Sequence, residues 1–152
     1  MGEFSSRLDS FNGLVIFNLN DKLFCADIDT VFAIVNPADY PKNFKNSYLI
    51  NSHLEIENYT ISVIDLHSLF GLHKNKITSL SRFICIEING QAFGFLADKV
   101  EEVLTLNSSS RKYFELIESK NEKFLSGEVK YRDAVFHLPN FQVIVNELLI
   151  HH

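Results

Sequence analysis

The feature that most constrains this chain is an Asn-Gly dipeptide between two apolar runs, in the stretch 83–104 (FICIEINGQAFGFLADKVEEVL). From residue 84 to residue 88, isoleucine alternates with Cys85 and Glu87. This is the period of a strand with one buried face. Asn89 and Gly90 then supply the two residues that tolerate positive φ in a type I′ turn. The pattern predicts a strand, a tight turn, a second strand, and a bend into a third strand or a short helix.

An earlier stretch repeats this unit. Residues 17–35 align without a gap on residues 86–104, an offset of 69 positions. The alignment contains four identities in 19 positions, together with the same turn and the same apolar pattern. The identical pairs are Asn20/Asn89, Phe24/Phe93, Asp29/Asp98 and Val31/Val100. The period is too long for a solenoid repeat and too short for two complete domains. We therefore expect two small β-barrels, each beginning with a hairpin and a bend, packed together.

Shorter signals place the other elements. Alternating or continuous apolar runs predict strands at 14–19, 23–28, 30–35, 59–66, 124–130 and 133–138, with a mixture of loop and strand over 47–56. We expect turns at Asn20–Lys22, at Glu57-Asn58 with Asn58 left-handed, and at Tyr131-Arg132. Residues 67–72 fit one helical turn, and 139–150 fit a C-terminal helix. The charged stretch 112–123 predicts a short helix or an irregular crossover.

Composition excludes several classes of protein. An apolar fraction of 46% in 152 residues is enough for a packed interior, and a net charge of −5 argues against a nucleic-acid surface. No apolar run reaches the length of a membrane span, and no signal peptide is visible, so we expect a cytoplasmic protein without membrane insertion. Cys25 and Cys85 then predict two reduced, buried thiols; a disulfide between them needs an oxidising compartment. Residues 1–12 predict a flexible tail, and His151-His152 the start of a purification tag.

The sequence carries no catalytic motif. It lacks a Gly-rich phosphate loop, a G-x-S-x-G elbow, an H-E-x-x-H motif and a cysteine/histidine cluster with zinc spacing, so we expect no catalytic residue, metal or cofactor. The repeat places Asp29 and Asp98 in the same position, where a short side chain that accepts a backbone N–H at a bend is expected. A small enzyme with a cleft holding His67, Asp65 and Ser62 is a third hypothesis, although strand alternation directs Ser62 away from Asp65.

Most of the chain, from about Leu14 to Leu149, resembles the CheW-like domain of bacterial chemosensory adaptors. Residues 90–103 are similar to the family pattern G-x-x-x-G-L-x-V-D-x-V-x-E-V, and 54–66 (LEIENYTISVIDL) to I-N-L-R-G-x-x-x-P-V-I-D-L. The segment 124–127 (FLSG) resembles the glycine-bearing strand before the last hairpin, and 141–149 the closing helix. In the second pattern the Arg-Gly pair becomes Glu57-Asn58, the Pro becomes Ser62 and the Asn becomes Glu55.

The resemblance implies an all-β fold of two SH3-like five-stranded β-barrel subdomains packed together, with a short C-terminal helix. It implies one domain over 13–150. The first barrel would span about 20–72, and the second about 81–140 together with the N-terminal strand 14–19. The helix would span about 140–149.

The resemblance also implies a non-enzymatic adaptor that couples chemoreceptors to a CheA-type histidine kinase in chemotaxis. The partners would be the kinase regulatory domain and the cytoplasmic tip of a methyl-accepting receptor. Carried over residue by residue, the partner-binding positions are Leu54, Ile56, Glu57, Asn58 and Ser62. Glu57 reverses the charge of the Arg in the family pattern and would repel a carboxylate that this Arg binds. The alternative is a divergent module for a surface-motility pathway, either twitching or gliding, or for another protein partner.

Overall fold

The computed structural model describes residues 10–44 and 53–150. Most of the expected tail and the terminal histidines therefore lie outside the described residues. The strands are β1 (Gly13–Leu19), β2 (Lys22–Asp27), β3 (Val31–Val35), β4 (His53–Ile56), β5 (Tyr59–Val63), β6 (Arg82–Ile88), β7 (Gln91–Ala97), β8 (Lys99–Thr105), β9 (Phe114–Glu118), β10 (Leu125–Tyr131) and β11 (Ala134–Pro139). The helices are α2 (Leu66–Leu69) and α3 (Phe141–Ile150), with 3-10 turns at Ile28–Thr30, Pro37–Asp39 and Arg111–Tyr113.

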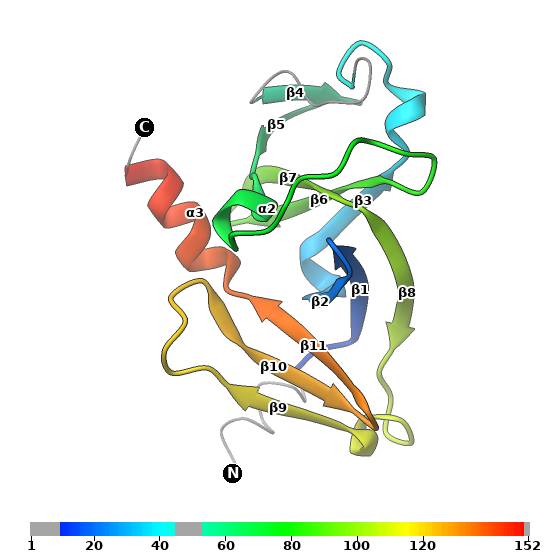
Figure 1. Cartoon of the computed structure of the whole chain (residues 1–152), viewed down its shortest axis with the longest axis vertical. Helices are drawn as coiled ribbons and strands as arrows, with labels where there is room; N and C mark the ends of the chain where they lie inside the picture. The colour runs from blue at the N-terminus through cyan, green and yellow to red at the C-terminus, as the bar shows by residue number, and fades with distance from the viewer. Residues whose placement is uncertain (1–9, 45–52, 151–152) are drawn as a thin grey trace. The chain divides into compact units, whose positions relative to one another are not determined.

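The strands form two sheets, drawn in Figure 1. One has six strands in the order β8-β1-β2-β11-β10-β9, and the other has five in the order β3-β6-β7-β5-β4. The mostly β architecture with a C-terminal helix agrees with the expectation. The expectation of two closed five-stranded barrels is wrong, because neither sheet closes on itself within the described residues. One sheet also has six strands, since β9 is added at its end.

Two units share the chain in an interleaved way. The first contains Met1–Ile16, Leu23–Asp29 and Glu102–His152; the second contains Phe17–Lys22 and Thr30–Glu101. The cause is a reciprocal exchange of strands. The strand after the first hairpin, β3, pairs with β6, whereas the strand after the second hairpin, β8, pairs with β1.

Because of this exchange, the strand pairings do not follow the expected barrel boundaries. The expected first barrel (20–72) included β2, which pairs with β11 in the six-stranded sheet. The expected second barrel (81–140) included β6 and β7, which pair with β3 and β5 in the five-stranded sheet. Apolar alternation identifies a strand and its buried face, but it does not identify the neighbouring strand.

The internal repeat is longer than the sequence indicates. In the parallel pairings, Phe24 of β2 lies opposite His137, and its counterpart Phe93 of β7 lies opposite Ser62. The β4–β5 hairpin is therefore the counterpart of β10–β11, at an offset of 75 positions from Ser62 to His137. The same offset relates the helix caps: Asp65 Oδ1 accepts the N–H of Ser68, and Asn140 Oδ1 accepts the N–H of Val143.

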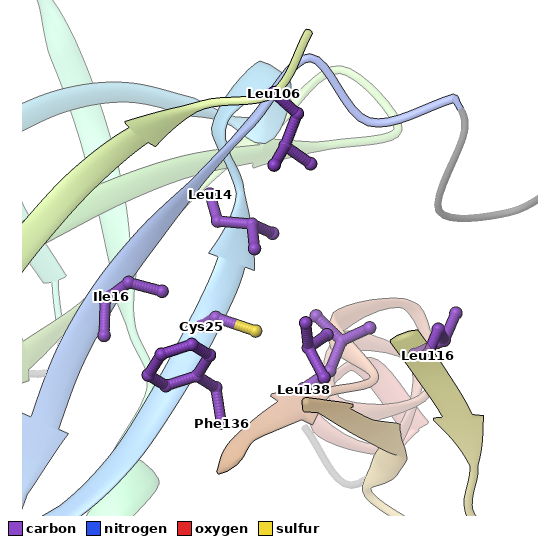
Figure 2. Packing of buried hydrophobic residues seen from close by; sticks show 8 residues of the cluster. Leu14, Ile16, Cys25, Leu106, Leu116, Phe136 and Leu138 are labelled. Atoms are coloured by element: carbon purple, nitrogen blue, oxygen red, sulfur yellow. The ribbon is translucent and has the colours of Figure 1, made fainter. Parts of the chain in front are cut away.

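Each unit has its own apolar core. In the first unit, side chains from β1, β2, β9, β10 and β11 pack together; Figure 2 shows Leu14, Ile16, Cys25, Leu116, Phe136 and Leu138 among them. In the second unit, the buried cluster consists of Phe44, Leu54, Ile56, Ile61, Phe83 and Cys85. Both cysteines are free and buried, as predicted, and burial raises the pKa of both thiols, that of Cys85 to about 12.

The hairpin turns agree closely with their sequences. Asn89 and Gly90 have φ of 54° and 80°, and Asn20 and Asp21 have φ of 51° and 67°, so both pairs use the positive φ that type I′ turns require. The charged stretch expected to form a helix or crossover contains β9, which pairs with β10 from Phe114 to Glu118. Two exposed glutamates, Glu115 and Glu118, give this strand a charged composition that does not indicate a strand.

Candidate partner-binding surface

The β4–β5 hairpin carries all five partner-binding positions expected from the resemblance. Leu54 and Ile56 are only 1% and 2% exposed, and they pack into the core of the second unit. Glu57 and Asn58 form the exposed turn. Ser62 is half-buried, opposite His53 on β4. The hairpin thus brings Glu57 and Asn58 together at its tip, while Leu54 and Ile56 hold the hairpin against the core.

The tip is held from one side by the loop that follows β3. The hydroxyl of Tyr40 donates to Glu57 Oε1 over 2.9 Å, and Asn43 Nδ2 donates to the carbonyl of Glu55 over 2.9 Å. The hydrogen bond to the Glu57 carboxylate raises the pKa of Tyr40. The left-handed residue of the turn is Glu57, at φ 57°, and not Asn58 as the sequence predicts. The Tyr40 bond orients the side chain of this residue.

Two exposed rings lie beside the tip. Phe32 on β3 and Tyr59, the first residue of β5, are 38% and 49% exposed, and their ring centroids are 4.7 Å apart. Ile34 shares the outer face of β3 with Phe32, because residues two apart on a strand point the same way, and it is 38% exposed. An exposed apolar surface bordered by Glu57 is typical of a protein contact site.

Sequence reasoning missed this surface. The β3 run VFAIV is apolar at every position, so it indicates a strand buried on both faces. In the structure β3 is an edge strand of its sheet, and the side chains of Phe32 and Ile34 are exposed on its outer face. A usable signal was the Asn36-Pro37 pair that ends the run, since proline is confined to sheet edges and strand ends.

Asp98 is the centre of a polar cluster in the same unit. Its Oδ2 accepts the backbone N–H of Asn20 at 2.6 Å and the amide of Asn75 at 2.9 Å, and its Oδ1 lies 3.1 Å from Nε2 of the buried His67. Burial alone would raise the pKa of Asp98, but these hydrogen bonds together lower it. The expected role, a short side chain accepting a backbone N–H at a bend, is confirmed for Asp98. Its counterpart Asp29 instead accepts the side-chain amide of Asn12 at 2.7 Å.

The residues of the enzyme hypothesis have other partners. His67 pairs with Asp98, whereas Asp65 caps α2 through Ser68 and forms an ion pair with Lys74 at 2.6 Å. Burial would raise the pKa of Asp65, but donation from Lys74 and Ser68 lowers it. No cluster of three potential metal ligands occurs in the described ranges. These contacts stabilise the start of α2 and the bend at Asp98. Among the described residues, no hydrogen bond connects Asp65 with His67.

Comparison with known proteins adds the decisive observation. The family model of the CheW-like domain matches residues 13–148. The chain belongs to the CheW-like domain family. Among solved structures, the scaffolding protein TtCheW from Thermoanaerobacter tengcongensis is similar with a TM-score of 0.63 and 25% sequence identity, covering 85% of this chain and 88% of that chain. No curated protein matches the chain.

The CheW-like pattern has physical causes in the second hairpin. Gly90 is at φ 80°, and a Cβ on Gly94 would lie 2.3 Å from Cε2 of Phe83. Asp98 holds the bend after β7 through its hydrogen bond from the backbone N–H of Asn20. The pattern's glycines and aspartate therefore maintain backbone shape. Glu57, one of the departures from the CheW-like pattern, lies at an exposed tip.

None of the helices in residues 10–44 and 53–150 is long and apolar enough to cross a membrane.

Proposed function

We propose that this CheW-like protein is a non-enzymatic cytoplasmic scaffold that couples chemoreceptors to a CheA-type histidine kinase. The observation that carries the proposal is the family match over nearly the whole chain, supported by the likeness to a scaffolding protein of similar length. The proposed partners are the kinase regulatory domain and the cytoplasmic tip of a methyl-accepting chemoreceptor. No cofactor or nucleic acid takes part.

The surface beside the β4–β5 tip is the proposed contact for the kinase domain. The Phe32–Tyr59 ring pair supplies apolar area at its centre. Glu57, Asn58 and Ser62 supply polar groups at its edge. In protein interfaces a few central residues, often aromatic, contribute most of the binding energy, and a polar rim surrounds them. Leu54 and Ile56 act indirectly, because they are buried and fix the position of the hairpin.

A second candidate partner is favoured by Glu57. A carboxylate at this tip repels the acidic group that an Arg would bind and attracts a basic one. The charge reversal favours a divergent partner with a basic patch, as in a specialised paralogue for a surface-motility pathway. Both candidates use the same surface and differ in the charge of the partner.

Calorimetric titration of the cognate kinase regulatory domain tests the proposal. We expect micromolar binding by the wild-type chain and at least about tenfold weaker binding after Phe32→Ser or Tyr59→Ser. Leu80→Ser, at an exposed site of the same unit, is the matched control and should bind like wild type. Absence of binding by the wild-type chain would refute coupling to that kinase. Stronger binding by Glu57→Arg would show that the reversed charge weakens the usual contact.

A further inference from the structure

The loop that follows β3 braces the β4–β5 tip, and residues 36–44 are called the bracing loop below. It begins with the capped 3-10 turn Pro37–Asp39. It ends at Phe44, which is 7% exposed and packs in the core of the second unit, with its ring centroid 5.3 Å from that of Phe83. Between these ends, the backbone N–H of Phe44 donates to the carbonyl of Tyr40 over 3.1 Å. The loop therefore holds Tyr40 in a fixed place beside the hairpin.

Two hydrogen bonds connect the bracing loop to the hairpin, and each holds a different part of it. Asn43 Nδ2 donates to the backbone carbonyl of Glu55, so it fixes the main chain of β4. The hydroxyl of Tyr40 donates to Oε1 of Glu57, so it fixes a side chain. The second oxygen, Oε2, has no hydrogen bond or ion pair to any described residue. The brace thus holds the carboxylate by one oxygen and leaves the other available.

The Tyr40 bond gives the charge of Glu57 one direction. Glu57 is exposed, and it lies at the left-handed φ of 57° in the turn. A long exposed side chain otherwise samples many rotamers, and fixing them on binding costs conformational entropy. Because the Tyr40 bond already restricts the side chain in the folded protein, a partner that binds the carboxylate loses less entropy.

An oriented carboxylate beside an apolar surface is an acceptor for a charge-assisted hydrogen bond from a basic side chain. Asn43 and the β4–β5 pairing already hold the main chain, so the Tyr40 bond adds direction to a charge. We propose that Tyr40 is a positioning residue that holds Glu57 for a basic group on the kinase regulatory domain. This inference rests on the proposed function, and it adds the charge of the group that the kinase presents.

The proposed role has two consequences that a purely structural role lacks. The effect of the Tyr40 hydroxyl passes through the charge of Glu57, so the two residues should be coupled in binding and their losses should not add. The contact is an exposed charge pair at the edge of the surface, so salt should screen it. Damage to the shape of the hairpin would instead weaken binding at every salt concentration.

A double-mutant cycle, measured by calorimetric titration of the cognate kinase regulatory domain, tests the proposal. At low salt we expect about tenfold weaker binding by Glu57→Gln and at least about threefold weaker binding by Tyr40→Phe, which keeps the ring. Tyr40→Phe should cause no further loss in the Glu57→Gln background. At about 1 M salt the variants should bind like wild type, because the Debye length is then only about 3 Å.

The matched control is Thr60→Val. It removes another hydroxyl that donates to a glutamate of the same hairpin, since Thr60 Oγ1 donates to Glu55 Oε1 over 2.8 Å. This variant should bind like wild type at both salt concentrations. Circular dichroism establishes that each variant is folded.

The outcomes separate this inference from the proposed function. Absence of binding by the wild-type chain refutes both. If the wild type binds, unchanged affinity of Glu57→Gln or stronger binding by Glu57→Arg overturns the basic partner group and leaves the coupling to the kinase standing. A Tyr40→Phe variant that binds like wild type at low salt overturns the positioning role. So does a loss that persists at high salt or is equally large in the Glu57→Gln background.

Discussion

Asp98 accepts a hydrogen bond from the backbone N–H of Asn20 at 2.6 Å, although 78 positions separate the two residues. The carboxylate joins the bend after β7 to the turn between β1 and β2. Through His67 and Asn75 it also holds α2 and the segment that follows it. One short side chain thus connects this bend with the β1–β2 turn, with α2 and with the segment that follows α2.

Removing this side chain should destabilise the protein. We expect Asp98→Ala to lower the free energy of unfolding by about 1–3 kcal/mol, because it leaves a buried His67 and a backbone N–H without their acceptor. Asp98→Asn keeps an acceptor oxygen and should cost less. Urea denaturation measures both, with Asp133→Asn, at an exposed turn, as the control. Equal midpoints for Asp98→Ala and wild type would contradict the anchoring role.

Stability should fall in acid because of two carboxylates. The pKa values of Asp98 and Asp65 are lower in the folded state than the value of about 3.9 for an unfolded aspartate. The folded state therefore binds these protons more weakly, and the stabilisation is complete above that value and is lost as the pH falls through the folded pKa. The double variant Asp65→Asn/Asp98→Asn should show a smaller loss below about pH 4 in denaturant titrations at several pH values. A wild-type stability that is constant down to pH 3 would argue against this linkage.

Gly94→Ala should overpack the core of the second unit. The new Cβ would lie 2.3 Å and 2.4 Å from two ring carbons of Phe83, and 3.1 Å from Cγ2 of Ile61. We expect a loss of about 1–3 kcal/mol by thermal or urea unfolding. Adding Phe83→Leu removes the ring atoms, so the alanine should cost less in that background than in the wild type. Additive losses in the double variant would show that the ring is not the cause.

The hydrogen bond at the exposed tip should be visible in a titration. We expect Glu57→Gln to move the pKa of Tyr40 down toward its ordinary value, because the raised pKa depends on the charged acceptor. NMR titration of ring-labelled tyrosine resolves Tyr40 from the others. Glu55→Gln, which alters the acceptor of Thr60 on the same hairpin, is the control. An unchanged Tyr40 titration in the Glu57→Gln variant would contradict the contact.

Local sequence signals predicted the hairpins well because turn chemistry is local. Asn89-Gly90 and Asn20-Asp21 require positive φ, and these residue types supply it. The D-x-V corner was also predictable, since an aspartate at a bend commonly accepts a backbone N–H. Glu57 and Arg132 take the same left-handed φ against their preference, and no local signal indicated this.

Long-range relationships were not predictable. The second half of the repeat, 54–66 against 129–141, contains no identical residue, so only the matching registers of Phe24 and Phe93 reveal it. The barrels failed as a prediction because alternation shows a buried face without showing whether a sheet closes. The Phe32–Tyr59 pair was missed because the two rings come from strands that are not neighbours in the sheet.

The exchange of β3 and β8 has a consequence for synthesis on the ribosome. The β1–β2 hairpin precedes the other strands, yet its partners β8 and β11 are translated only after β3 to β7. The second unit needs nothing beyond Glu101, so it can fold while translation continues. The parts of β1 and β2 that belong to the first unit must wait for β11, and a nascent chain that stalls after the second unit would expose them to chaperones.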